Sequence, residues 1–312
     1  DIGTKISIEE YNRTCREAVM EFTGVWENLT RRMGYWVNMD DPYITYDNKY
    51  IETLWWLLKQ LFDKGLLYKG YTIQPYSPAA GTGLSTHELN QPGCYRDVKD
   101  TTCTAQFRVV RDERSERFFE GVEGELYFLA WTTTPWTIPA NLAICLNKDY
   151  TYALVDSEKG KFIVLEELVD QLWEKFGLQR KEILGTYKGA QLEMITCQHP
   201  LYDRESLVIL GDHVTADAGT GCVHTAPGFG ADDFFVCQKY GIDAYCNVDE
   251  HGCMMEDCGE WLAGQYVDDA NKTVTMKLDE LGCLLKMEWI THAYPHDWRT
   301  KKPIIFRATT QW

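Results

Sequence analysis

The segment WTTTPWTIPAN combines hydroxyls, an amide and a large aromatic ring, and could bind a polar ligand. A strand leading into it should end at Pro135, which cannot donate to a sheet, so that hydroxyls and backbone N–H groups face a turn. Trp136 stands between two prolines and is suited to form a pocket wall. Threonine also suits an ordinary strand, so a purely structural role stays open. The candidate residues here are Thr132, Thr133, Thr134, Trp136, Thr137 and Asn141.

A second segment, DAGTGCVHTAPGFGADD, holds an imidazole and, nine residues later, a carboxylate. His224 ends a short apolar strand and Asp233 begins a helix, so the intervening turn can bring both side chains towards one point. A carboxylate there can hold an ammonium, and an imidazole can orient a hydroxyl or a water. Thr220 and Gly221 join the candidate substrate-binding residues, although the segment lacks the GxxxxGK[ST] pattern of a phosphate loop. A core histidine and a helix N-terminal charge are the alternative interpretations.

Other constellations give weaker indications of covalent or metal chemistry. Cys222 shares a strand face with His224, but nothing marks its thiol as activated. The serine-hydrolase pattern GxSxG does not occur, and neither does CxxC or HExxH. Two close pairs could each supply two metal ligands: Cys253 with Cys258, and His292 with His296. Neither has an obvious second pair to complete a four-ligand site. We therefore expect no metal site and no protein nucleophile.

Charge and composition exclude several function classes. A net charge of −16 argues against binding nucleic acid over the whole surface, which needs a basic footprint. The closing segment THAYPHDWRTKKPIIFRATTQW is locally basic and is the most suitable place to meet a phosphate; an ordinary solvated charged face is the alternative. Eleven cysteines without a regular framework indicate reduced thiols in a cytoplasmic protein. No apolar run could span a membrane, no signal peptide is visible, and the abrupt ends suggest part of a longer chain.

The elements that position these residues follow from periodicity. Apolar residues three or four apart favour one helix over residues 8–33 and a second over 49–64. Short strands then alternate with helices over 102–285, which indicates a mixed α/β domain, barrel-like or sandwich-like. We expect an N-terminal flank (1–101) and a return segment (286–312) to form a supporting layer of helices and short strands.

Together these segments resemble the isoleucyl-tRNA synthetase family. WTTTPWTIPAN, DAGTGCVHTAPGFGADD and HAYPHDWRTKKPIIFRATTQW occur in the family's order, and DPYITYDNKYIETLWWLLKQLFDKGLLYKG also fits, so the likeness covers essentially the whole chain. Trp136 favours the isoleucyl members over the valyl and leucyl ones, where an arginine usually follows the threonines. The resemblance implies the insert called connective peptide 1, a β-barrel-like editing domain with surrounding helices, plus flanks leading to a catalytic domain.

The implied activity is hydrolysis of valine wrongly esterified to the isoleucine tRNA. One methylene is worth only about 1–3 kcal/mol of discrimination, and isoleucine against valine is the standard example of that limit. By the family motif, the three consecutive threonines bind the terminal ribose and the ester, while Trp136 and His224 bound the amino-acid side chain. Asp233 binds the α-ammonium, and a positioned water attacks. The expected catalytic residues are Thr132, Thr133, Thr134, His224 and Asp233; the expected substrate-binding residues are Trp136, Thr137, Asn141, Thr220 and Gly221.

The resemblance also sets expectations for cofactors and partners. The family's HIGH and KMSKS motifs are absent, so this chain should use neither ATP nor Mg²⁺, which the full-length enzyme requires. The expected partner is the acceptor end of the isoleucine tRNA, and the valine moiety attached to it is the expected editing substrate. The protein is expected to be a monomer and to bind no membrane.

Many relatives hold zinc between two CxxC pairs, but the matching positions here are Ser77, Ala80, Asp297 and Thr300. We therefore expect no zinc, and packing must hold that junction. Two other functions stay open. One is a non-catalytic module that docks the acceptor end, which the acidic charge favours. The other is an unrelated hydrolase of small esters.

Overall fold

The computed structural model describes residues 2–312, which divide into two units with a boundary between Tyr68 and Lys69. This boundary lies ahead of the expected one after residue 101, because the segment from residue 70 onward pairs with the C-terminal strands. Within the described part of the chain, no helix combines the length and the apolar character needed to cross a membrane.

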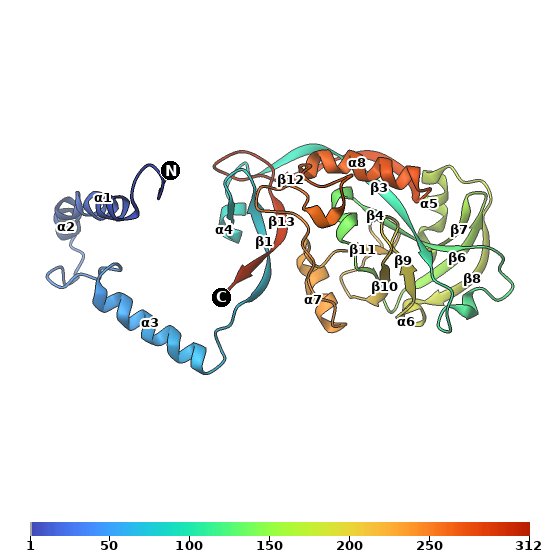
Figure 1. The fold of residues 1–312 in the computed structure, drawn as a ribbon, viewed down its shortest axis with the longest axis horizontal. Helices are drawn as coiled ribbons and strands as arrows, with labels where there is room; N and C mark the ends of the chain where they lie inside the picture. Colours follow the sequence, from blue (N-terminus) through green and yellow to red (C-terminus); the bar gives the residue numbers. More distant parts are fainter. Residues whose placement is uncertain (1) are drawn as a thin grey trace. The chain divides into compact units, whose positions relative to one another are not determined.

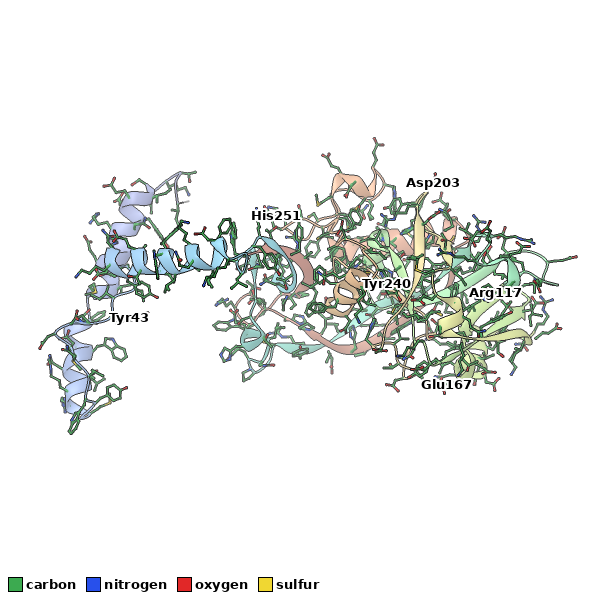
Figure 2. All side chains as sticks on the ribbon, turned by 90° about the horizontal axis from the view of Figure 1, so that it is seen from below. Tyr43, Arg117, Glu167, Asp203, Tyr240 and His251 are labelled. Atoms are coloured by element: carbon green, nitrogen blue, oxygen red, sulfur yellow. The ribbon has the colours of Figure 1, made fainter. Side chains whose placement is uncertain are left out.

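The first unit holds three helices, α1 (Ile8–Met20), α2 (Thr23–Arg32) and α3 (Asn48–Asp63). Ser7 caps α1 by accepting a hydrogen bond from the Glu10 backbone N–H at 3.1 Å. A single helix over 8–33 was the wrong expectation: the chain breaks before Thr23, whose hydroxyl bonds the Met20 carbonyl and competes with the helical ladder. The side chains of these helices project on all sides, and none is buried (Figure 2).

The second unit is built on a ten-stranded mixed sheet, which confirms the mixed α/β class (Figure 1). Six strands pair in a closed circuit, β3–β9–β10–β5–β11–β4 and back to β3, and give the sheet a barrel-like centre. From this circuit, β12 extends on one side, and β7, β6 and β8 on the other. The strands are β3 (Tyr95–Val109), β4 (Leu126–Thr132), β5 (Ala143–Leu146), β6 (Thr151–Ser157), β7 (Gly160–Leu165), β8 (Glu182–Lys188), β9 (Thr196–Gln198), β10 (Glu205–Leu210), β11 (Val223–Thr225) and β12 (Leu284–Pro295).

A smaller sheet joins the two ends of this unit and consists of β13 (Ile305–Gln311), β1 (Gly70–Ser77) and β2 (Thr82–Gly83). Next to it, β3 and β12 form a long antiparallel ribbon, whose register runs from Tyr95 opposite Pro295 to Ala105 opposite Leu284. This ribbon crosses both of the domain boundaries expected from the sequence, after residues 101 and 285. The first part of β3, YRDVKDT, is mostly charged and polar, so it carries no apolar alternation to mark it as a strand.

Helices cover the large sheet, and α8 runs beside β3 (Figure 1). The helices of eight or more residues are α5 (Val169–Phe176), α7 (Ala231–Lys239) and α8 (Val267–Glu280). The shorter ones are α4 (Thr86–Leu89), η1 (Glu116–Phe118), η2 (Pro135–Ala140), η3 (Glu166–Leu168), α6 (Gly189–Leu192) and η4 (Glu256–Cys258). Helix α5 ends at Gly177, which has a φ of 70° that glycine adopts without strain.

Candidate functional site

The threonine segment forms a directed chain of hydrogen bonds where β4 gives way to η2. The Oγ1 atoms of Thr132 and Thr134 lie 3.3 Å apart, as do those of Thr134 and Thr137. Thr137 donates its one hydroxyl proton to the Thr134 carbonyl at 2.8 Å. Thr134 must therefore donate to Thr137, and Thr132 to Thr134. Strand β4 ends at Thr132, before Pro135 as predicted. The hydroxyls of Thr132, Thr134 and Thr137 form the hydrogen-bond chain at and after this strand end.

His224 joins this chain from β11, which pairs with both β4 and β5. Its Nε2 lies 2.9 Å from Thr137 Oγ1, and its Nδ1 lies 2.8 Å from the Asn141 amide nitrogen. Because that amide donates to Nδ1, the imidazole proton sits on Nε2 and is donated to Thr137. Burial lowers the pKa of His224 to about 4, so the ring is neutral at pH 7. Both ring nitrogens are engaged, and the imidazole orients a hydroxyl.

Asn141 fixes this tautomer through contacts of its own. Its Nδ2 also donates to the Ala143 carbonyl at 2.8 Å, and its Oδ1 accepts a hydrogen bond from Ser206 Oγ. Ser206, on β10, escaped sequence analysis because an isolated serine in an apolar strand carries no signal of a role. Asn141 is therefore held by hydrogen bonds within the sheet, and its amide in turn fixes the His224 imidazole.

Asp233 lies in the first turn of α7 and holds the loop that follows His224. Its Oδ2 accepts a hydrogen bond from the Ala226 backbone N–H at 2.8 Å. Burial raises the pKa of Asp233 to about 6, Asp232 adds to the rise, and the Ala226 N–H opposes it. The carboxylate is therefore mostly ionised at pH 7. Among the described residues its second oxygen has no hydrogen-bond partner, and none of the contacts joins Asp233 to the threonines or the imidazole.

Trp136 and Thr133 face a cavity of about 220 Å³ on the same segment. The Trp136 ring is only 5% exposed and packs edge-on against Phe229 with centroids 5.0 Å apart. Its backbone N–H donates to Asn271 Oδ1 on α8 at 3.0 Å. The lining comprises Val98, Asp100, Thr133, Thr134, Trp136, Asp268, Asn271, Tyr294 and Pro303. Thr134 therefore belongs to both the cavity and the hydrogen-bond chain.

Thr220 and Gly221 lie apart from this network, within the sheet. The Thr220 hydroxyl donates to the Leu129 carbonyl, and the Gly221 carbonyl accepts from the Tyr152 hydroxyl at 2.9 Å. Gly221 has a φ of 78°, and a Cβ there would clash with the Cβ of Leu165. These contacts account for both residues structurally, so their role in substrate binding stays a prediction.

The thiol of Cys222 is fully buried, and burial raises its pKa far above the ordinary value. A thiolate is therefore disfavoured, and the geometry speaks against a Cys222–His224 nucleophile pair.

The four positions at which the family resemblance implies zinc ligands in relatives come together in this chain as a polar cluster. Asp297 Oδ2 accepts from Ser77 Oγ at 2.8 Å and from Thr300 Oγ1 at 2.9 Å, and the Ala80 N–H donates to Ser77 Oγ at 3.3 Å. Burial alone would raise the pKa of Asp297, but hydrogen bonds from the Arg299 N–H and these hydroxyls hold it below its ordinary value. Across residues 2–312, no three metal-ligating side chains gather to hold an ion. The absence of zinc stays a prediction.

Comparison with known proteins assigns the chain to a family. The family model described as tRNA synthetases class I (I, L, M and V) matches residues 1–312. The isoleucine–tRNA ligase of Porphyromonas gingivalis is 44% identical over 100% of this chain, and that of Geobacillus thermodenitrificans is 41% identical over 98%. The chain spans about a third (32%) of the length of each.

Among solved structures, the editing domain of the P. knowlesi cytosolic leucyl-tRNA synthetase is similar with a TM-score of 0.47. It is 12% identical, over 63% of this chain and 97% of that one. Since the family model covers every residue of the sequence, the chain belongs to the class I tRNA synthetases of the isoleucine, leucine, methionine and valine group.

Proposed function

We propose that this chain is the editing part of an isoleucyl-tRNA synthetase and hydrolyses the ester of valine wrongly attached to the isoleucine tRNA. One observation carries the proposal: a chain of threonine hydroxyls is directed by a neutral buried imidazole. The carboxylate of Asp233, which holds the loop after that imidazole, is assigned to the same site by the proposal. Sequence likeness to isoleucine–tRNA ligases supports the choice of amino acid. The chain would act in the cytoplasm as a monomer, with the tRNA acceptor end as its partner and no cofactor of its own.

In this mechanism the ionised Asp233 binds the α-ammonium of the esterified valine through its free oxygen. The threonine hydroxyls bind the terminal ribose and the ester. A water oxygen attacks the ester carbonyl carbon, the bond from that carbon to the ribose oxygen breaks, and valine leaves as its carboxylate. His224 is neutral with both nitrogens engaged, so it does not take the proton of the water. The vicinal ribose hydroxyl relays one proton of the water to the leaving oxygen, and the second proton passes to solvent as valine becomes its carboxylate.

Selectivity requires walls that do not yield to an extra methylene. Trp136 is fixed by Phe229 and Asn271, and His224 is fixed by two hydrogen bonds through its ring nitrogens. Both side chains are almost completely buried, so neither can swing aside at low cost. A pocket bounded by them would accept valine and reject isoleucine on size.

Deacylation of valyl- and isoleucyl-tRNA by the chain tests the proposal, with Asp233→Ala as the inactive variant and Asp232→Ala as the matched control. Hydrolysis of the valyl ester alone, lost in the Asp233 variant and kept in the control, is the expected result. tRNA binding without turnover at any concentration would instead indicate the non-catalytic docking module that the charge of −16 favours. Turnover of simple esters without any response to tRNA would indicate an unrelated hydrolase.

A further inference from the structure

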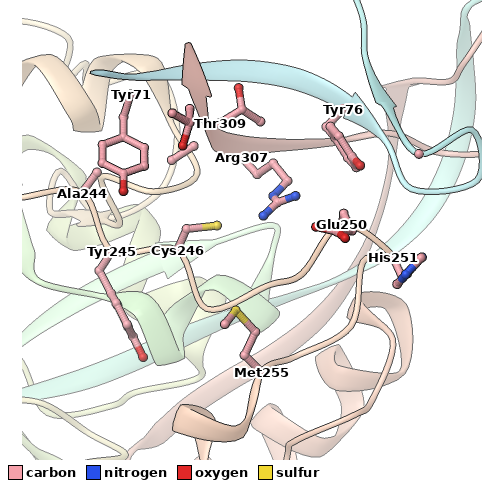
Figure 3. A pocket seen from close by; sticks show the side chains of 13 residues that line it. Tyr71, Tyr76, Ala244, Tyr245, Cys246, Glu250, His251, Met255, Arg307 and Thr309 are labelled. Atoms are coloured by element: carbon pink, nitrogen blue, oxygen red, sulfur yellow. The ribbon is translucent and has the colours of Figure 1, made fainter. Parts of the chain in front are cut away.

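A second and larger pocket, of about 870 Å³, lies at the small sheet and shares no residue with the threonine network (Figure 3). Strands β1 and β13 form one side of it, and the segment after α7, residues 244–255, forms the other. Its lining comprises Tyr71, Tyr76, Gly81, Ala244, Tyr245, Cys246, Glu250, His251, Met255, Arg307, Ala308, Thr309 and Thr310.

Arg307 reaches into the middle of this pocket (Figure 3). Its guanidinium lies over the Tyr76 ring, 5.1 Å from the centroid, and makes no ion pair with any described residue, Glu250 included. Its Nε is buried without a hydrogen-bond partner in the described chain. By contrast, Arg299 in the same basic segment pairs with Glu88 at 2.7 Å. A partly buried guanidinium without an anion is costly, so the pocket is arranged to receive one.

We propose that this pocket binds a phosphate group of single-stranded RNA, with Arg307 on the phosphate and Tyr71 as a stacking surface for a base. The guanidinium fork matches phosphate oxygens, and Tyr76 beneath it holds the fork in place. Tyr71 is 63% exposed and offers its ring to a base. Thr310 adds a hydroxyl to the lining of the pocket, whereas the Thr309 hydroxyl already donates to Gln74 Oε1 at 2.8 Å. The net charge of −16 repels the RNA backbone, so an RNA strand requires a local cation such as the Arg307 guanidinium in order to bind.

The site rests on the proposed function for its biological partner, because the 3′ end of a tRNA is a single strand of this kind. A free nucleotide offers the same phosphate chemistry, and the experiment separates the two sources. Binding of a fluorescent five-nucleotide RNA ending in CCA is measured by anisotropy with the full chain, with AMP and inorganic phosphate as competitors.

Arg307→Gln should weaken RNA binding about tenfold or more, with a slope of log affinity against log salt shallower by about 0.7. Arg307→Lys should restore the slope. Tyr71→Ala should weaken binding without changing the slope, because it removes stacking and no charge. The matched control is Arg108→Gln, an exposed arginine paired with Glu125 outside the pocket, which should bind like the native chain.

Native affinity and slope in Arg307→Gln, or an equal loss in the Arg108 control, would overturn the proposal. Competition by AMP at the same concentration as the RNA would also overturn it, in favour of a free-nucleotide site. Should Arg307→Gln fail to fold, Arg307→Lys and Tyr71→Ala still decide. A chain that binds RNA through Arg307 yet deacylates nothing would refute the proposed function alone.

Discussion

Replacing Asp233 by asparagine should lower editing activity and raise stability at the same time. The substituted amide oxygen can still accept the Ala226 N–H, which lies 2.8 Å from the native carboxylate, so the loop after His224 keeps its support. The lost quantity is the negative charge that binds the substrate ammonium. A hydrogen bond to a charged group is worth about 1.5–3 kcal/mol, which corresponds to a roughly 10- to 150-fold lower kcat/KM.

The pKa of Asp233 determines how the editing activity and the stability of the fold each depend on pH. Its value of about 6 in the folded chain means that native kcat/KM should rise through pH 6 and level off above it, because only the ionised form binds the ammonium. In the unfolded chain the carboxyl ionises near 3.8, so ionisation favours the unfolded state and costs stability as the pH rises from 3.8 to 6. The shift of about two units corresponds to up to about 3 kcal/mol, which Asp233→Asn should recover at pH 7.

Two measurements check this expectation: deacylation of valyl-tRNA between pH 5 and 8, and urea unfolding at pH 7. Asp232→Asn is the matched control, since it removes the same charge from the neighbouring, exposed position of the same helical turn. The reasoning fails if Asp233→Asn keeps native activity and the inflection near pH 6. It also fails if the activity is lost together with stability, because the carboxylate would then be a structural support only.

Three further changes test other parts of the site. His224→Ala should open the side-chain wall and let the chain deacylate isoleucyl-tRNA; an unchanged preference for the valyl ester would place the wall elsewhere. Thr137→Val leaves the buried His224 Nε2–H without an acceptor and should cost about 1–3 kcal/mol in urea unfolding; native stability would contradict the assigned tautomer. Asp297→Ala strands the Ser77 and Thr300 hydroxyls and should lower Tm, whereas EDTA should leave Tm unchanged; a fall with EDTA would reveal a metal.

Local signals located much of the fold correctly. The strand into the threonine segment ends before Pro135, α5 stops at Gly177, and the helix predicted over 49–64 is α3. In each case the signal and its consequence lie within a few residues, because a proline, a glycine or an apolar stripe acts on its own backbone. The first part of β3 and its pairing with β12 were missed, since residues 95–101 are mostly charged and polar and are specified by pairing across the chain.

The sequence by itself determined the family, the mixed α/β class and the two segments that hold the candidate site residues, because motifs and local periodicity specify these features. Only the tertiary structure decided which candidates meet. It joins His224 to Asn141, 83 residues away, and to Thr137, 87 residues away, and it leaves Thr220 and Gly221 in the sheet. It also sets the charges, lowering the pKa of His224 and raising that of Asp233. Partners so distant along the chain, and the burial that shifts a pKa, exist only once the strands have closed around them.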